Sequence, residues 1–371
     1  MSPKQDQLFN PGARLYEPDV VVFAGDGEPR SPEMHAARLA EISATKGIDP
    51  DRYALGGVVE ELENRFAEIF GKPAAIWLPT GSMGNHLALR RHAGVAGRVI
   101  VQEQSHVYHD EGDSLQRLGS LNVIPLGHGQ TGFTVEELER AIDESVNGRV
   151  VNPIGALQIE SPVRRQAGQM VSFDDMQKIT TLCREHAIPT HLDGARLYMM
   201  SAATGISVRD YTDLFDSAYV SMYKYFGAPF GAILTGTEKF IEGMYHERRM
   251  YGGGLSSASL PAALALDGVD GFEARFSQAM TQAAELFEQL NEITGVEVGT
   301  FENGSNNYEI HLDESIDSFE FASALAEHDV FMNNATTEWR NMLLQVNTTI
   351  LRKQNSEILE AFADAASKTR N

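Results

Sequence analysis

Cysteine is almost missing from this chain, and long apolar runs are missing altogether. Cys183 is the single cysteine among 371 residues, so no intrachain disulfide can form, as is usual in a reducing cytoplasm. No apolar run approaches the roughly 18 residues of a transmembrane span. The opening residues, M-S-P-K-Q-D-Q, lack the apolar segment of a signal peptide. We therefore expect a cytoplasmic protein that does not enter membranes, with Cys183 as a buried core residue.

Basic side chains are scarce relative to acidic ones. The chain has 30 Lys and Arg against 52 Asp and Glu, which gives a formal net charge of −22 at pH 7. Nucleic acids and anionic membrane surfaces attract basic patches, so neither is an expected partner. A hydrophobic fraction of 42% is ordinary for a globular protein, and a chain of this length can bury a sizeable core and form two domains.

Apolar strands alternate with helices between residues 58 and 222. The expected strands are 74–78, 99–102, 123–126, 156–160, 189–193 and 218–222; the expected helices are 58–70, 135–146, 172–186 and 195–203, with one more opening after Pro79. Thr134 and Glu137 form a capping box at the start of one helix. Such alternation predicts an α/β fold with a mostly parallel sheet covered by helices on both faces. Ligands of these sheets bind beyond the carboxyl ends of the strands.

The pattern changes after the triple glycine Gly252–Gly254. A long helical stretch over about 260–290 precedes four expected strands, at 296–298, 307–312, 330–333 and 342–346, with helices near 318–327 and 356–366. We therefore expect a loop-like N-terminal extension at 1–20, a large domain at 21–258 and a smaller α+β domain at 259–371.

Two short segments place reactive side chains just after expected strands. Thr190–Arg196 reads T-H-L-D-G-A-R, and Ser221–Gly231 reads S-M-Y-K-Y-F-G-A-P-F-G. A lysine such as Lys224 can condense with the aldehyde of pyridoxal phosphate, and a carboxylate such as Asp193 can keep the pyridine nitrogen protonated. Aromatic neighbours would disfavour the ammonium form of Lys224. Taken singly, Lys224 could be a solvated charge and Asp193 a helix N-cap.

Several motifs in a fixed order resemble the threonine aldolase and aromatic amino acid β-eliminating lyase family of fold-type-I pyridoxal-phosphate enzymes. The likeness runs from about Val22 to beyond Leu260. Besides the two segments above, it is carried by Asp26 in F-A-G-D-G, Tyr53, P-T-G-S-M-G-N at Pro79–Asn85, S-H-V-Y at Ser105–Tyr108, and Gly252–Gly254.

This resemblance implies a role for each matching side chain around pyridoxal phosphate. Lys224 would carry the cofactor and shuttle protons, Asp193 would pair with its ring nitrogen, and His106 would stack on its ring. Gly81 and Ser82 would hold the phosphate at the positive end of a helix. A strand-end histidine or a strand–turn–helix can also be purely structural.

The substrate side of the site is also implied by the resemblance. Arg196 would grip the substrate carboxylate, since a guanidinium suits a bidentate contact; it is also expected near the cofactor. Asp26, Tyr53, Tyr223 and Arg340 are expected to contact substrate. Tyr53 would reach the site of a neighbouring subunit in a homodimer or homotetramer, unless it is an ordinary core tyrosine. The acidic run His109–Asp113 is expected to face solvent rather than bind a metal.

Several positions depart from the family pattern. Val163 takes the place of a histidine implicated in handling the substrate β-hydroxyl, and Tyr223 takes the place of a serine before the lysine. Leu255-Ser256 replace an arginine after the triple glycine. The second carboxylate-binding arginine is missing from the strand near 343–346, although Arg340 lies close upstream. We therefore expect an intact cofactor half and an altered substrate half.

The expected function is that of a pyridoxal-phosphate-dependent lyase acting on an L-amino acid. The leading candidate reaction is threonine aldolase-like cleavage of a β-hydroxy-α-amino acid to glycine and an aldehyde. In this reaction a water, Tyr223 or His106 would accept the hydroxyl proton. We expect poor cleavage of threonine and a preference for a bulkier or less polar side chain. The alternatives on this fold are β-elimination, racemisation or transamination of another amino acid. A regulatory or carrier protein that binds the cofactor without turnover is a further alternative.

Overall fold

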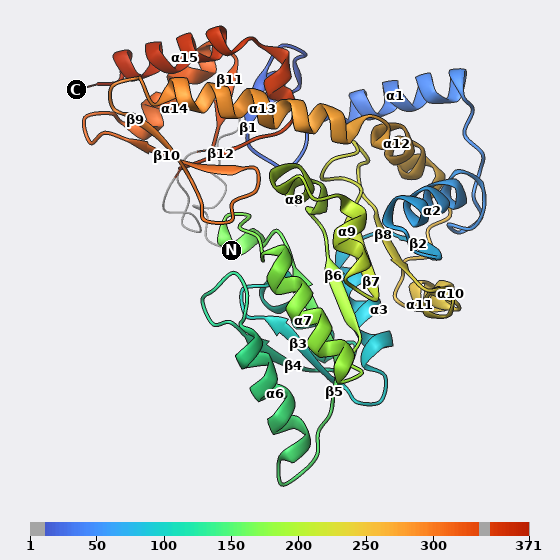
Figure 1. Cartoon of the computed structure of the whole chain (residues 1–371). Helices are drawn as coiled ribbons and strands as arrows, with labels where there is room; N and C mark the ends of the chain where they lie inside the picture. Colours follow the sequence, from blue (N-terminus) through green and yellow to red (C-terminus); the bar gives the residue numbers. More distant parts are fainter. Residues whose placement is uncertain (1–11, 334–341, 371) are drawn as a thin grey trace. The chain divides into compact units, whose positions relative to one another are not determined.

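The computed structural model describes residues 12–333 and 342–370 (Figure 1). These residues form two compact units. One is His35–Asp270; the other joins the described residues before His35 to those from Gly271 onward. This division differs from the expected boundaries at 21, 258 and 259. The N-terminal segment belongs to the C-terminal unit because β1 (Val21–Phe23) pairs in parallel with β11 (Val330–Met332).

A seven-stranded sheet organises His35–Asp270, with the strand order β2-β8-β7-β6-β5-β3-β4. Its strands are β2 (Ala74–Leu78), β3 (Arg98–Gln102), β4 (Asn122–Leu126), β5 (Ile154–Glu160), β6 (Thr190–Asp193), β7 (Ser217–Ser221) and β8 (Ala232–Gly236). Only β8 runs against its neighbours β2 and β7. The carboxyl ends of the other six strands therefore share one edge, where side chains from distant parts of the chain can meet.

Helical segments lie before, between and after the strands of this sheet. They are α1 (Pro32–Thr45), α2 (Gly57–Phe70), α3 (Gly81–Ala93), α4 (His106–His109), α5 (Ser114–Arg117), α6 (Val135–Asn147), α7 (Phe173–Glu185), α8 (Leu197–Thr204), α9 (Val208–Asp213), α10 (Glu238–Ile241), α11 (Met244–Met250) and α12 (Ser259–Val269), with a 3-10 turn at Arg164–Gln166. In Figure 1, α6 and α7 run over the face of the sheet turned to the viewer. Helix α3 packs against β5, β6, β7 and β8.

Local sequence signals explain several helix ends. The capping box of α6 is present: the Thr134 hydroxyl accepts from the backbone N–H of Glu137, and the Glu137 carboxylate accepts from the backbone N–H of Thr134. Helix α2 ends at Gly71, whose left-handed φ of 62° suits glycine. Cys183 lies on α7 and is fully buried, as predicted.

The C-terminal unit is a separate α+β body. Its strands are β1, β9 (Val296–Thr300), β10 (Asn307–Leu312), β11 and β12 (Met342–Gln345), and its helices are α13 (Phe272–Leu290), α14 (Ser318–Glu327) and α15 (Asn355–Lys368), with 3-10 turns at Gly12–Tyr16 and Thr348–Arg352. Strands β12, β10 and β9 form an antiparallel sheet. Phe362 contacts Phe23 and Phe321 in the core, with ring centroids 6.3 and 5.8 Å apart.

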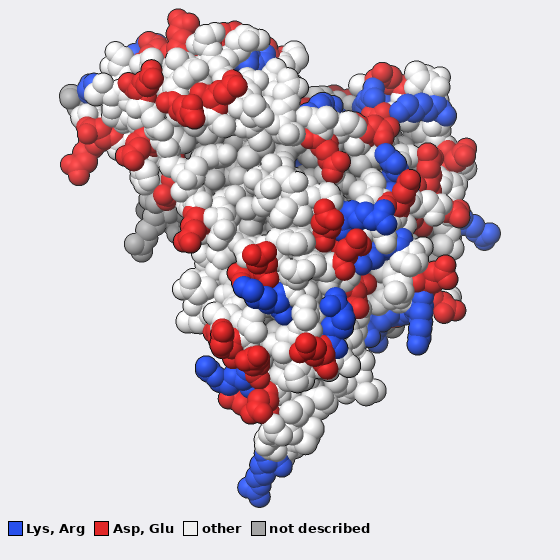
Figure 2. All heavy atoms as spheres, viewed as in Figure 1, with Lys and Arg blue, Asp and Glu red and all other residues white. Residues whose placement is uncertain are grey.

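The acidic excess is distributed over the surface. On the face drawn in Figure 2, acidic side chains predominate over the helices of the C-terminal unit, and acidic and basic side chains are interspersed over the larger unit. Within the described residues, none of the helices combines the length and the apolar character that a bilayer span requires.

Candidate active site

A cavity of about 310 Å³ opens at the carboxyl edge of the seven-stranded sheet. A volume of this order suits a small organic ligand. Seven of the predicted site residues line it, namely Gly81, Ser82, His106, Asp193, Arg196, Tyr223 and Lys224. They lie at the end of β6 or in the segments that follow β2, β3, β6 and β7. The parallel arrangement of these strands explains how residues so distant in sequence reach one cavity.

Asp193 is the last residue of β6 and is almost fully buried, with 2% of its surface exposed. Its carboxylate accepts from the Asn85 side-chain amide at 2.6 Å and from the Ala195 backbone N–H at 3.1 Å. Burial raises the pKa of Asp193, while the positive charge of Lys224 lowers it. A cation placed in the cavity would therefore favour the ionised carboxylate.

Lys224 lies three residues beyond the end of β7 and lines the same cavity. Its ammonium lies 5.6 Å from the centroid of the Tyr223 ring. The following aromatic residue, Tyr225, is buried and donates its hydroxyl proton to the Ala195 carbonyl oxygen. This bond ties the segment that carries Lys224 to the segment that follows Asp193, so the amine and the carboxylate are held in one site.

The amino end of α3 forms a different part of the cavity wall. Thr80 caps the helix by accepting from the Met83 backbone N–H at 3.2 Å, and the N–H groups of the first turn lie at the positive helix end. Gly81 and the hydroxyl-bearing Ser82 both line the cavity. A Cβ on Gly81 would overlap the Tyr219 hydroxyl oxygen, so glycine is required here by close approach. An anionic group fits this end of the cavity.

Replacing Gly81 by alanine should damage both the fold and ligand binding. The added methyl must displace the Tyr219 side chain or the first turn of α3, and we expect a loss of about 2 kcal/mol in unfolding free energy. Gly84→Ala in the same helix is a matched control. Its Cβ would meet Leu78 and Tyr219 atoms at 3.6 Å, an ordinary contact. Alanine there should be neutral or stabilising by up to about 1 kcal/mol. Chemical denaturation measures the unfolding free energy of each variant. Equal losses in the Gly81 and Gly84 variants would contradict the overlap of the Gly81 Cβ with Tyr219.

His106 is held by two glutamates that the sequence analysis did not identify. The Glu160 carboxylate accepts from the backbone N–H groups of His106 at 2.5 Å and of Arg164 at 3.0 Å. The ring Nδ1 of His106 lies 3.1 Å from Glu111 Oε1, and this bond raises the pKa of His106. Burial raises the pKa of Glu160, with Asp193 adding to the effect. The bonds of Glu160 join the loops that follow β3 and β5.

Tyr53 lies outside this cavity, within the fully described unit His35–Asp270. Its side chain is 41% exposed, so it is no ordinary core tyrosine. Tyr53 and Ala54 adopt left-handed φ values of 55° and 59°. The buried Arg248 donates to the carbonyl oxygens of Tyr53 at 3.2 Å and Ala54 at 3.0 Å, and the Arg249 guanidinium lies 4.6 Å from the Tyr53 ring centroid. These contacts hold Tyr53 at the surface.

Three other predicted positions do not reach the cavity or cannot be placed in it. Val163 is fully buried, bridges Gln169 in a short antiparallel pair and is not among the residues that line this cavity in its fully described unit, so its expected effect on substrate preference stays a prediction. The chain turns after β5, and the Val163 N–H donates to the Gln169 carbonyl oxygen at 2.8 Å. Asp26 belongs to the other unit. Arg340 lies outside the described residues. The roles of Asp26 and Arg340 stay predictions.

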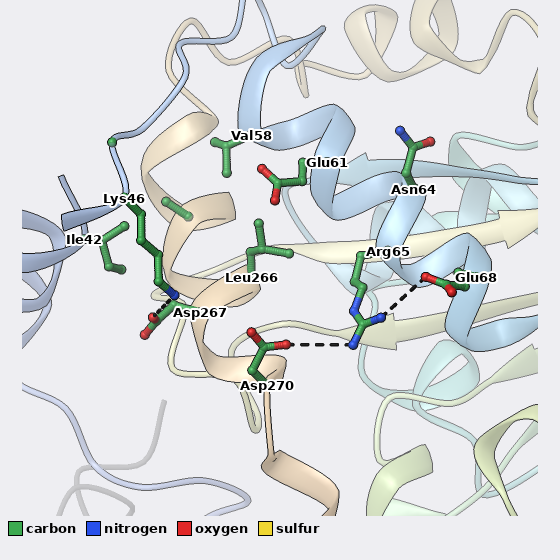
Figure 3. A pocket seen from close by; sticks show the side chains of 12 residues that line it. Ile42, Lys46, Val58, Glu61, Asn64, Arg65, Glu68, Leu266, Asp267 and Asp270 are labelled. Carbon is green, nitrogen blue, oxygen red and sulfur yellow. Dashed lines mark hydrogen bonds and ion pairs between the residues drawn. The ribbon is translucent and has the colours of Figure 1, made fainter.

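A second pocket lies between α1, α2 and α12 and has a different character (Figure 3). Both of its basic side chains are paired: Lys46 lies 3.2 Å from Asp267, and Arg65 lies 3.4 Å from Glu68 and 3.8 Å from Asp270. Such exposed pairs are common on protein surfaces. The cavity at the sheet edge, with its buried carboxylate and adjacent lysine, is therefore the candidate active site.

The acidic run after His106 is used in protein contacts. Asp110 forms ion pairs with Arg164 at 3.3 Å and Arg165 at 3.2 Å. The Glu111 side chain is only 1% exposed, which differs from the expected solvent-facing position because it reaches back to His106. Across the described residues, no group of three His, Cys, Asp or Glu side chains is arranged to hold a metal ion.

Known proteins share this architecture and much of this sequence. A family profile for beta-eliminating lyases matches residues 31–312. The low-specificity L-threonine aldolase of Candida albicans is 32% identical over 212 residues, which cover 56% of each chain. A protein of Exiguobacterium sp. 255-15, solved as a candidate aromatic amino acid beta-eliminating lyase/threonine aldolase, is 25% identical with a TM-score of 0.79, covering 95% of this chain and 99% of that one.

A candidate L-allo-threonine aldolase of Listeria monocytogenes EGD-E is also 25% identical, with a TM-score of 0.77 over 95% of this chain and 98% of that one. The fold is that of the fold-type-I pyridoxal-phosphate-dependent enzymes, as predicted. The chain belongs to the beta-eliminating lyase family, which confirms the resemblance seen in its motifs. It spans 56% of the length of the Candida albicans aldolase.

Proposed function

We propose that this protein is a pyridoxal-phosphate-dependent lyase that cleaves a β-hydroxy-α-amino acid to glycine and an aldehyde. The observation that carries the proposal is the meeting of Lys224, Asp193 and the amino end of α3 in one cavity. The amine of Lys224 matches an aldehyde, the carboxylate of Asp193 matches a pyridine nitrogen, and the amino end of α3 matches a phosphate. The names of the aldolase relatives support the same reaction.

The cofactor would supply an electron sink for the charge that develops at the substrate Cα. Lys224 would provide the nucleophilic amine and then carry protons. Asp193 would keep its negative charge against the ring nitrogen, and Ser82 with the first N–H groups of α3 would hold the phosphate. Arg196 would bind the α-carboxylate of the substrate, because a guanidinium offers two parallel donors.

Cleavage of the Cα–Cβ bond needs a base for the β-hydroxyl proton. As the bond breaks, its electron pair moves to Cα, the hydroxyl proton leaves, and Cβ becomes the carbonyl carbon of the aldehyde. The bond to Glu111 raises the pKa of His106 and so favours the protonated ring. His106 is therefore better suited to donate or stack than to accept. We assign the acceptor role to a water or to Tyr223.

The substrate side chain would meet an aromatic wall. Tyr223 and Phe230 line the cavity and are 52% and 38% exposed, so they can still lose surface to a ligand. Aromatic rings offer a large apolar surface, which favours a bulky side chain over the small one of threonine. We infer that threonine is a poor substrate and that a bulkier or less polar side chain is preferred.

A product screen tests the reaction directly. Purified holoprotein is offered a panel of L-amino acids, and aldehyde, pyruvate with ammonia, and keto acid are measured separately. Aldehyde with an equal amount of glycine supports aldol cleavage, whereas pyruvate and ammonia would show β-elimination and a keto acid transamination. Absence of turnover with a bound cofactor would favour the regulatory or carrier alternative.

Changing Tyr223 to serine should shift the substrate preference. The smaller side chain removes the aromatic ring from the wall, so we expect the ratio of kcat/KM for threonine over a phenyl-bearing β-hydroxy amino acid to rise about tenfold. Tyr16→Ser, which alters a tyrosine 38% exposed in the other unit, should leave the ratio unchanged. An unaltered ratio in the Tyr223 variant would exclude Tyr223 from side-chain recognition.

A homodimer or homotetramer acting in the cytoplasm is part of this proposal. It is supported by the surface position of Tyr53, which the family resemblance assigns to the site of a partner subunit. The single, buried Cys183 suits a reducing compartment.

A further inference from the structure

A chain of hydrogen bonds runs from the candidate active site into the protein interior. Asn85 Nδ2 lies 2.6 Å from Asp193 Oδ2, and Asn85 Oδ1 lies 3.1 Å from His191 Nε2. His191 Nδ1 lies 2.8 Å from Ser217 Oγ, which lies 2.7 Å from His92 Nε2. Asn85, His191 and Ser217 are each no more than 1% exposed, so water does not compete for these bonds.

Three elements bring the five side chains together. His191 and Asp193 lie two residues apart on β6, so their side chains point to the same face of the sheet. Ser217 lies directly beside His191 on the neighbouring strand β7. Asn85 and His92 are seven residues, or two turns, apart on α3, which packs on this face. The hydrogen-bond chain thus joins two neighbouring strands to the helix that packs on them.

With Asp193 ionised, the donors and acceptors along these hydrogen bonds fit one direction. An ionised Asp193 accepts only, so the Asn85 NH₂ faces it and the Asn85 carbonyl oxygen needs a donor. That donor is His191 Nε2–H. Burial lowers the pKa of His191 to about 3, so the ring is neutral and its Nδ1 accepts from the Ser217 hydroxyl. Ser217 in turn accepts from His92 Nε2–H, and burial lowers the pKa of His92 to about 4.

We propose that His191 is a positioning residue that sets the protonation state of Asp193 through Asn85. While His191 presents Nε2–H, the Asn85 amide keeps its NH₂ toward Asp193 and favours the carboxylate. If Asn85 turned over, its carbonyl oxygen would face Asp193 and favour the protonated acid, which cannot hold a pyridine nitrogen in its protonated form. This inference rests on the proposed function, since it concerns the ring-binding role of Asp193.

Two substitutions of His191 separate positioning from packing. His191→Leu keeps an apolar body of similar size but removes both ring nitrogens. We expect its dissociation constant for pyridoxal phosphate to rise about tenfold, because Asn85 loses the donor that orients it. His191→Gln can donate to Asn85 and accept from Ser217, so it should recover most of this loss. His128→Leu, at a ring 94% exposed, is the matched surface control.

The protonation state of the cofactor ring nitrogen distinguishes the two roles of His191. If His191 served only to pack the core, its replacement would leave this protonation state unchanged. With ¹⁵N-labelled pyridoxal phosphate, the ring nitrogen should be protonated in the wild type and in His191→Gln, and largely unprotonated at neutral pH in His191→Leu. A protonated ring and unchanged affinity in His191→Leu would overturn the proposal.

Histidine NMR on the wild-type protein tests the same point without any substitution. With ¹⁵N-labelled histidine, His191 should remain in the neutral Nε2–H form from about pH 8 down to about pH 5. The lower end of this range lies below the usual histidine pKa, where an ordinary ring would be charged. An Nδ1–H form, or a charged ring in this range, would overturn the assigned direction even if His191→Leu fails to fold. A protein that shows the Nε2–H form but binds no pyridoxal phosphate would contradict the proposed function and not the hydrogen-bond chain.

Discussion

Lys224→Ala should reduce amino-acid cleavage by at least about 10³-fold, because it removes both the nucleophile and the proton carrier. Pyridoxal phosphate should still bind, held by the amino end of α3 and by Asp193, but without a covalent link. Turnover measured with saturating cofactor checks the first point. Borohydride reduction followed by gel filtration under denaturing conditions checks the second, since the reduced cofactor should stay on the wild type and be removed from the variant.

Lys239→Ala is the matched control for this experiment. Lys239 is an exposed residue of α10 and does not line the cavity. Its replacement should leave both turnover and covalent attachment at wild-type levels. Retention of substantial activity in the Lys224 variant, without added amines, would show that another group performs the chemistry.

Asp193→Asn should lower kcat by about 10³-fold while leaving much of the cofactor binding in place. The amide is nearly isosteric, so packing around β6 is preserved, but it carries no negative charge to keep the ring nitrogen protonated. KM should change less than kcat, since Asp193 does not face the substrate carboxylate. Steady-state kinetics with saturating cofactor, together with unfolding curves, separates the catalytic effect from any loss of stability.

Asp213→Asn provides the control for Asp193. Asp213 lies on α9 with its side chain 55% exposed, so the same chemical change there should have no effect on kcat. A fall in kcat of less than about tenfold in the Asp193 variant would be too small for a group that stabilises charge at the reaction centre.

Much of the architecture could be predicted because local patterns and tertiary packing agree. Strand β2 and helix α14 have the predicted bounds, and the capping box fixes the start of α6. Strand β8 lies between β2 and β7 in the sheet but was not predicted. Its five residues follow a glycine-rich turn and do not alternate apolar with polar side chains, so no sequence pattern indicates a strand. The expected helical stretch 260–290 is two helices, since Gly271 adopts a φ of 69° between them.

The residues of the site could be predicted only where each follows its own strand. Lys224 and Asp193 were found in this way, because the carboxyl end of a parallel strand is a known position for ligands, whereas His106 was assigned through the family resemblance. Glu160 also ends a strand, but it holds His106 only because the loop that follows β3 brings the His106 backbone N–H to its carboxylate. Asn85 and His191 needed knowledge of which side of α3 meets β6, which no local pattern contains.

The most direct test of the account is to locate the cofactor on the chain. The holoprotein is reduced with borohydride, digested, and its peptides are mapped by mass spectrometry. Our account predicts a reduced phosphopyridoxyl group on the peptide that contains Lys224 and on no other lysine. The modification of a different lysine, or the absence of any modified peptide from a protein saturated with pyridoxal phosphate, would contradict it.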